Sequence, residues 1–239
     1  MRQPLVLLPG LMCDHTVWDA QIEALTDIAD ARVVEWGMQH TTLVEMAQAA
    51  LAAAPQRFAL AGHSMGGRVA FEVYRLAPER VTHIAVMNTG VIPRAEGEAG
   101  EEEARGRRHL LDIAFQQGIR AMAMEWMKGM VPEHRRGDAV LVDAIVGMFE
   151  RKTPELFLVQ QQALLARRDA RPVLETIQCP ALVLTGGDDA WSPPAAHEKI
   201  AAGIAGSQLV IVPRSGHMST MEQPTAVSAA MRSWLSGSR

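Results

Sequence analysis

The chain has 239 residues, of which 48% are hydrophobic and 21% charged, and its formal net charge is -4. This length and composition suit one core with room for an inserted subdomain. The weak negative charge gives no basis for binding nucleic acid or an anionic membrane, and two cysteines are too few for a disulfide framework.

The amino-terminal stretch MRQPLVLLPG contains only a short apolar run before Pro9 and Gly10. This run is too short for the hydrophobic region of a signal peptide, and no later stretch is predicted to cross a bilayer. Low cysteine content is typical of reducing compartments. The sequence therefore predicts a cytoplasmic protein whose partner is a small molecule, with no nucleic acid or membrane involved.

Short apolar runs alternate with helical patterns along most of the chain. Most runs lack polar–apolar alternation, which favours strands buried on both faces. The predicted strands are residues 4–10, 31–36, 57–62, 81–88, 180–186 and 207–213. The predicted helices include Thr41–Ala54, Gly66–Leu76, Pro194–Ala205 and a last helix that begins near Pro224. This alternation predicts a parallel sheet with helices on both faces.

Residues 91–175 interrupt the alternation, because this interval contains helical patterns and no convincing strand. Its charged beginning, RAEGEAGEEEARGRRH (94–109), is expected to be a solvated face. We predict a helical insertion at 91–175 in a core formed by residues 1–90 and 176–239.

Ser64 lies at a predicted strand-to-helix junction, in the stretch FALAGHSMGGRVAFEV. A sharp turn there would lift the serine hydroxyl clear of the sheet, and Gly62 and Gly66 remove side chains that would collide. The same turn would aim the N–H of Met65 at an oxyanion on the substrate. We predict Ser64 as a nucleophile and Met65 as an oxyanion donor; the alternative is a glycine-rich turn that serves packing.

A serine nucleophile needs a base that accepts its proton. Of the eight histidines, His217 is the predicted base because of its position in the chain. It follows the last predicted strand, at the sheet edge where open α/β proteins bind ligands. We expect His63, in the tight turn, to be a packing or hydrogen-bonding residue. The acid that orients His217 is Asp188 or Asp189, because both follow strand 180–186. No cysteine or histidine stands beside this pair at metal-ligand spacing, so we expect no metal.

Four segments together make the chain resemble the α/β-hydrolase fold superfamily: LLPGL (7–11), GHSMGG (62–67), GGDDAWSPP (186–194) and SGHMSTMEQP (215–224). The resemblance implies a three-layer α/β fold and a Ser–Asp–His triad without a cofactor. In that family the acid lies three residues after the glycine that ends its strand, and a proline follows four residues later. Gly186, Asp189 and Pro193 match this spacing, which favours Asp189 over Asp188.

The resemblance also implies a second oxyanion donor. The family's His-Gly-X segment reads Pro9-Gly10-Leu11 here, so Leu11 matches the donor position. The family often begins with two antiparallel strands that this chain lacks. We therefore expect six parallel strands in the order 31–36, 4–10, 57–62, 81–88, 180–186, 207–213. The insertion matches the family's helical cap, which would cover the serine, exclude water and select substrates.

Methionines and tryptophans accompany the predicted catalytic loops and the insertion. Met12, Trp126, Trp191 and Met218 are predicted to contact the substrate, with ordinary core packing as the alternative. Cys13 has no evident base partner and is expected to be a small buried residue.

These features predict a serine hydrolase that cleaves a carboxylic ester, or a related acyl bond, of a small and largely apolar molecule. Lactone or enol-lactone hydrolysis, carbon–carbon bond hydrolysis and acyl transfer are alternatives that use the same constellation. A non-catalytic ligand receptor is a further alternative, and it would bind its ligand without turnover.

Overall fold

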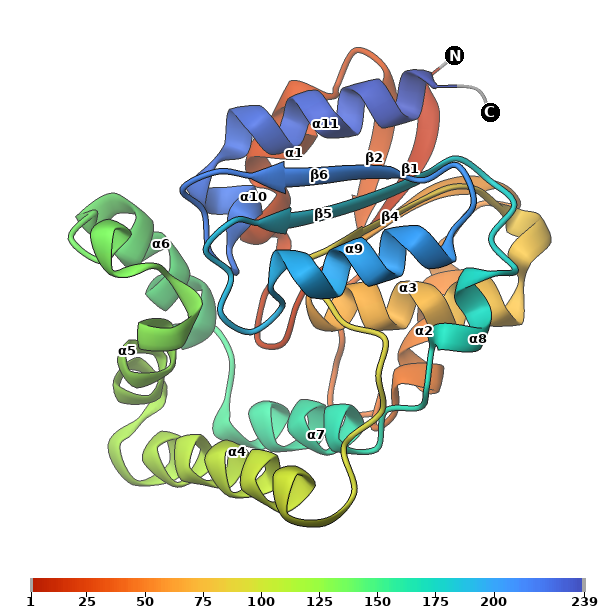
Figure 1. The fold of residues 1–239 in the computed structure, drawn as a ribbon. Helices are drawn as coiled ribbons and strands as arrows, with labels where there is room; N and C mark the ends of the chain where they lie inside the picture. The colour runs from red at the N-terminus through yellow and green to blue at the C-terminus, as the bar shows by residue number, and fades with distance from the viewer. Residues whose placement is uncertain (1, 238–239) are drawn as a thin grey trace.

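A sheet of six parallel strands forms the centre of the protein, as the computed structural model shows for residues 2–237. The strand order is β2-β1-β3-β4-β5-β6, and every neighbouring pair is parallel (Figure 1). The predicted order and direction are both confirmed. The strands are β1 (Gln3–Leu8), β2 (Ala29–Val33), β3 (Phe58–His63), β4 (Val81–Met87), β5 (Ala181–Gly186) and β6 (Gln208–Val212).

Burial of the strands follows their place in the sheet. Every residue of β3 and β5 is buried, whereas the edge strands β2 and β6 are partly exposed. Burial on both faces was therefore a correct prediction for the central strands and a wrong one for the edges. β2 also starts earlier and ends sooner than predicted, because its ladder with β1 runs only from Gln3–Ala29 to Leu7–Val33.

Helices cover both faces of the sheet and complete three layers (Figure 1). One face carries α1 (Asp19–Ala24) and α11 (Pro224–Ser236), with the short α10 (Ser219–Glu222) beside them. The other face carries α2 (Leu43–Ala53), α3 (Met65–Leu76) and α9 (Pro194–Gly203). Short 3-10 helices are η1 (His15–Trp18), η2 (Pro78–Arg80) and η3 (Glu133–Arg135).

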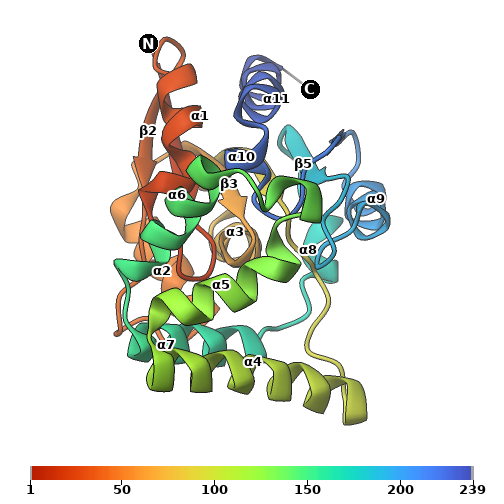
Figure 2. The same cartoon turned by 90° about the vertical axis from the view of Figure 1, so that its left-hand side faces the viewer.

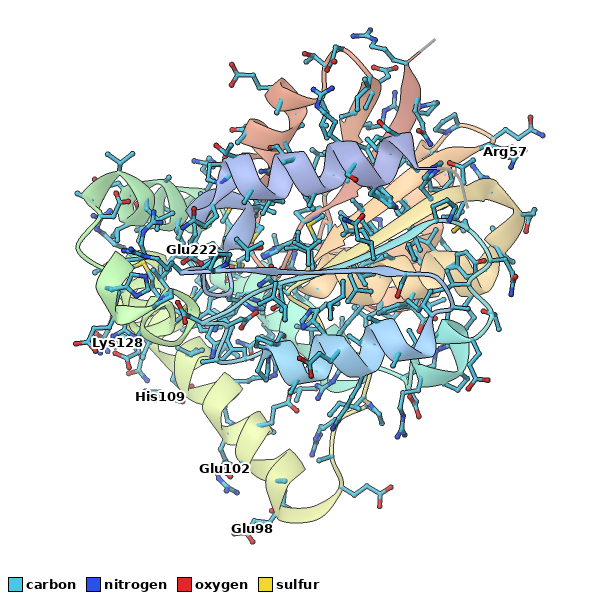
Figure 3. The ribbon with its side chains drawn as sticks, turned by 45° about the horizontal axis from the view of Figure 1, so that its top comes forward. Arg57, Glu98, Glu102, His109, Lys128 and Glu222 are labelled. Atoms are coloured by element: carbon cyan, nitrogen blue, oxygen red, sulfur yellow. The ribbon has the colours of Figure 1, made fainter. Side chains whose placement is uncertain are left out.

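Between β4 and β5 the chain is helical throughout. The helices are α4 (Gly97–Gln117), α5 (Ile119–Met130), α6 (Ala139–Glu150), α7 (Pro154–Leu165) and the short α8 (Arg171–Leu174). Figures 1 and 2 show α5 and α6 beyond the carboxyl ends of β5 and β6, with α4 and α7 side by side. Glu98, Glu102 and His109 of α4 are exposed, and Figure 3 shows them on the outer side of that helix. None of the helices within residues 2–237 is long and apolar enough to cross a membrane.

Candidate active site

Ser64 occupies a strained turn between β3 and α3. Its φ of 54° and ψ of -115° lie outside the regions that non-glycine residues ordinarily adopt. Two glycines make the turn possible: a Cβ on Gly62 would lie 2.2 Å from the carbonyl oxygen of Gly66, and one on Gly66 would lie 2.1 Å from that of Leu8. Backbone strain of this kind is concentrated at functional sites, where the surrounding structure maintains it.

Three side chains from three separated loops form one hydrogen-bonded series. The Ser64 Oγ lies 2.8 Å from His217 Nε2, and His217 Nδ1 lies 2.9 Å from Asp189 Oδ2. Asp189 is buried, whereas the side chain of Asp188 is exposed and takes no part in the series. The structure therefore brings together the serine, the histidine and the second of the two predicted acids.

Asp189 is held in its ionised form. Burial favours the neutral acid, but the neighbouring His217 and several hydrogen bonds outweigh it and hold the pKa of Asp189 well below its usual range. Its Oδ1 accepts the backbone N–H groups of Trp191 and Ser192. The carboxylate can therefore accept the imidazole N–H of His217 at neutral pH and stabilise an imidazolium.

Asn88, which sequence reasoning missed, connects the acid to the histidine loop. Its side-chain amide donates to Asp189 Oδ2 at 2.9 Å and to the carbonyl oxygen of Gly216 at 3.1 Å, and its Oδ1 accepts the Ser219 hydroxyl. Asn88 is fully buried and has a φ of 48°. A polar residue directly after a buried parallel strand was the available signal.

Glu222 holds the backbone on both sides of His217. Its carboxylate accepts the N–H of Gly216 at 2.9 Å and that of Met218 at 3.0 Å, and the side chain is buried at the carboxyl end of the sheet (Figure 3). Burial raises the pKa of Glu222 in spite of these hydrogen bonds. Sequence reasoning missed this role because only the folded loop shows which N–H groups lack a carbonyl partner.

His63 packs under the histidine loop. The ring is fully buried, and its Nε2 lies 2.8 Å from the carbonyl oxygen of His217, so Nε2–H is the donor. Burial lowers the pKa of His63 to about 4, which keeps the ring neutral. This arrangement agrees with the expected packing and hydrogen-bonding role.

The two predicted oxyanion donors belong to two turns that are distant in the sequence: Leu11 follows β1, and Met65 directly follows Ser64 after β3. Leu11 lines the cavity above the serine, and Met65 is the first residue of α3. Neither backbone N–H has a hydrogen-bond acceptor among residues 2–237. An unpaired N–H of this kind is what the prediction of an oxyanion donor requires.

A small, narrow cavity adjoins the Ser64–His217 pair. Of the predicted substrate contacts, Trp126, Trp191 and Met218 line it, but Met12 does not. Met12 is fully buried, and its backbone N–H donates to a side chain of α7. The full lining consists of Gly10, Leu11, Cys13, His63, Ser64, Trp126, Met130, Phe149, Trp191, His217 and Met218.

Stacked aromatic rings form one wall of the cavity. Trp191 lies edge-on to His217 with ring centroids 4.9 Å apart and stacks on Trp126 at 5.7 Å, and Trp126 contacts Phe149 at 5.4 Å. Gly129 leaves room for this stack, because a Cβ there would lie 2.7 Å from Trp191 Nε1. Among residues 2–237, no Lys, Arg, Asp or Glu side chain lines the cavity, so the wall favours uncharged groups.

Cys13 is buried beside the cavity, and burial strongly raises the pKa of its thiol. The protonated thiol is a poor nucleophile, in agreement with the expectation of a small buried residue. Within residues 2–237, no group of three or more His, Cys, Asp or Glu side chains is arranged to hold a metal ion.

Comparison with known proteins identifies the family. The model of the alpha/beta hydrolase family matches residues 5–230. A pimeloyl-[acyl-carrier protein] methyl ester esterase of Pectobacterium carotovorum is 28% identical, and the match covers 93% of this chain and 90% of that protein. A thermophilic esterase from Thermogutta terrifontis is 29% identical with a TM-score of 0.85, covering 98% and 89% of the two chains. The enol-lactonase of Burkholderia xenovorans LB400 has a TM-score of 0.84 at 22% identity and covers 99% and 91%. The chain belongs to the alpha/beta hydrolase family.

Proposed function

We propose that the protein is a serine hydrolase that cleaves carboxylic esters of small, largely uncharged molecules. The observation that carries the proposal is the hydrogen-bonded series from Ser64 through His217 to the ionised Asp189. The likeness to two esterases over most of their length supports ester hydrolysis as the reaction.

In the proposed mechanism, Ser64 Oγ attacks the ester carbonyl while its proton passes to His217 Nε2. The strained turn presents the hydroxyl to the carbonyl, and Asp189 stabilises the imidazolium that forms. The N–H groups of Leu11 and Met65 bind the oxyanion of the tetrahedral intermediate. No metal or organic cofactor takes part in these steps.

The second half of the reaction repeats the first with water. His217 gives its proton to the departing alkoxide, which leaves an acyl group on Ser64 Oγ. A water molecule then loses a proton to the same Nε2 and attacks the acyl carbonyl. Collapse of the second intermediate breaks the Ser64–acyl bond, returns the proton to Oγ and releases the carboxylic acid.

The inserted helices act as a cap in this proposal. Trp126 of α5 and Phe149 of α6 close the cavity over Ser64, so the insertion excludes water and limits the acyl group. The cavity is narrow and rings from both helices line it, which favours short acyl groups. Lactone opening is the same acyl–oxygen cleavage and belongs in the same substrate panel.

The test is hydrolysis of aryl esters of increasing acyl length, and of several lactones, by the native protein and by Ser64→Ala. We expect short acyl esters to be hydrolysed and the variant to lose about 10⁴-fold or more of kcat. Equal rates from both proteins would contradict the proposal. Tight ligand binding without multiple turnover would favour the receptor alternative instead.

A further inference from the structure

The turn that carries Leu11 has an unusual shape for its sequence. The N–H of Cys13 donates to the carbonyl oxygen of Gly10 at 3.1 Å, and Met12 between them has a φ of 63°. A positive φ at this third position, with Leu11 in the ordinary region, defines a type II turn, which normally has glycine or asparagine there. Something outside the turn must therefore favour this form with methionine in place.

Two buried side chains hold the peptide between Leu11 and Met12 at both ends. The N–H of Met12 donates to Gln160 Oε1 at 2.8 Å, and the Cys13 thiol lies 3.6 Å from the carbonyl oxygen of Leu11, which accepts it. Gln160 is only 2% exposed and belongs to α7 of the insertion. Without it, the buried N–H would lose the partner that the structure gives it.

Loss of Gln160 would favour a different turn. If this peptide rotated, Met12 would return to a negative φ and the turn would become type I. The Leu11 carbonyl would then point where the Met12 N–H now points. Rotation of that peptide alone would not move the Leu11 N–H, which belongs to the preceding Gly10–Leu11 peptide. The carbonyl oxygen of this preceding peptide accepts the Cys13 N–H, so the direction of the Leu11 N–H is fixed while the turn keeps that hydrogen bond and is released if the turn opens instead.

We propose that Gln160 is a positioning residue that fixes the oxyanion turn from the inserted helices, and so sets the direction of the Leu11 N–H. The inference rests on the proposed function, because an oxyanion forms only if Ser64 attacks an acyl carbonyl. It gives the insertion a part in transition-state stabilisation, in addition to enclosing the substrate.

The neighbouring glutamine provides a matched control. Gln161 is 4% exposed on the same helix but forms no hydrogen bond with residues 10–13. Gln160→Met and Gln161→Met therefore remove the same amide from the same helix at similar burial. Only the first removes the acceptor of the turn.

The experiment compares an aryl ester with its thionoester, in which sulfur replaces the carbonyl oxygen. Sulfur is a weak hydrogen-bond acceptor, so the thionoester depends less on the oxyanion donors. We expect Gln160→Met to lower kcat for the oxygen ester about tenfold to a hundredfold with little change in KM, and to lower the oxygen-to-sulfur rate ratio. Gln161→Met should keep both values.

Gln160→Glu keeps an acceptor oxygen on a side chain of the same length, so it should keep the oxygen-to-sulfur rate ratio. This variant tests the inference if Gln160→Met fails to fold. An unchanged ratio in folded Gln160→Met, or an equal loss in Gln160→Glu or Gln161→Met, would overturn the inference while the proposed function stands. Equal rates from the native protein and Ser64→Ala would overturn both.

Discussion

The six-stranded core and the inserted helices contribute different things to one site. The core provides the three groups that react in the proposed mechanism: Ser64 follows β3, Asp189 follows β5 and His217 follows β6. The insertion provides contacts that hold and enclose those groups. The comparison teaches that the ends of strands place the proposed catalytic side chains. The positions of the loops that carry them also depend on contacts with helices that contribute no catalytic side chain.

The insertion contacts both loops on which the proposed mechanism depends. The N–H of His217 donates to the carbonyl oxygen of Met130, at the end of α5, and Arg135 donates to the carbonyl oxygen of Glu222. On the other side, Arg151 forms two hydrogen bonds with Asp14, at 2.7 Å and 3.1 Å. These links make the insertion a support for the site as well as a cover.

The largest expected effect tests the core. Asp189→Asn removes the charge that stabilises the imidazolium and leaves the packing almost intact, so kcat should fall about 10⁴-fold. Asp188→Asn is the matched control, because its side chain is exposed one residue away, and it should stay within about threefold of the native rate. Steady-state kinetics on one aryl ester gives both values. A larger loss in Asp188→Asn would reverse the assignment of the acid.

A second effect tests how the core supports the histidine loop. Because the pKa of His63 is about 4 in the folded protein and 6.5 is its ordinary value, the unfolded chain binds a proton between these values and the folded chain does not. Stability therefore decreases as the pH falls from 7 to 5, by about 2 kcal/mol for this group.

Urea unfolding of the native protein and of His63→Gln at both pH values measures this contribution. The variant should lose about 2 kcal/mol less than the native protein on acidification. The same loss in both proteins would show that the ring is protonated in the folded state, and would contradict its role as a neutral donor to the His217 carbonyl.

The smallest expected effect tests whether the inserted helices enclose the acyl group of the substrate. Trp126→Ala removes the ring between Trp191 and Phe149, so the ratio of kcat/KM for a hexanoyl ester to that for an acetyl ester should rise about tenfold. Met124→Ala is a control on the same helix, because Met124 is 44% exposed and should leave the ratio unchanged. An unchanged ratio in Trp126→Ala would place the acyl group elsewhere.

The same contrast explains what could be predicted. Ser64 and His217 could be predicted to lie together because the motif around the serine and the loop after the last strand place them at one sheet edge. The choice of Asp189 over Asp188 needed the family resemblance, since both follow the strand. The burial of Asp189 and its contact with His217 now agree with that choice.

Of the supporting residues, only Asn88 had a signal in the sequence, because it directly follows a buried parallel strand. Asn88, Glu222 and Gln160 act through hydrogen bonds to backbone groups that are distant in the chain or exposed only by a particular turn. Met12 was predicted to contact substrate because it adjoins a predicted catalytic loop, but its side chain is fully buried and does not line the cavity. No local pattern in the sequence signals a turn held from another part of the fold.

The central claim is that the hydroxyl of Ser64 carries the acyl group during turnover, and it can be tested by trapping that state. Native protein mixed with excess aryl ester, quenched in acid within the first turnovers and digested, is examined by mass spectrometry. We predict the mass of one acyl group on the peptide that contains Ser64, and none in Ser64→Ala. An acyl group on another residue during native turnover, or continued turnover by the alanine variant, would contradict the account.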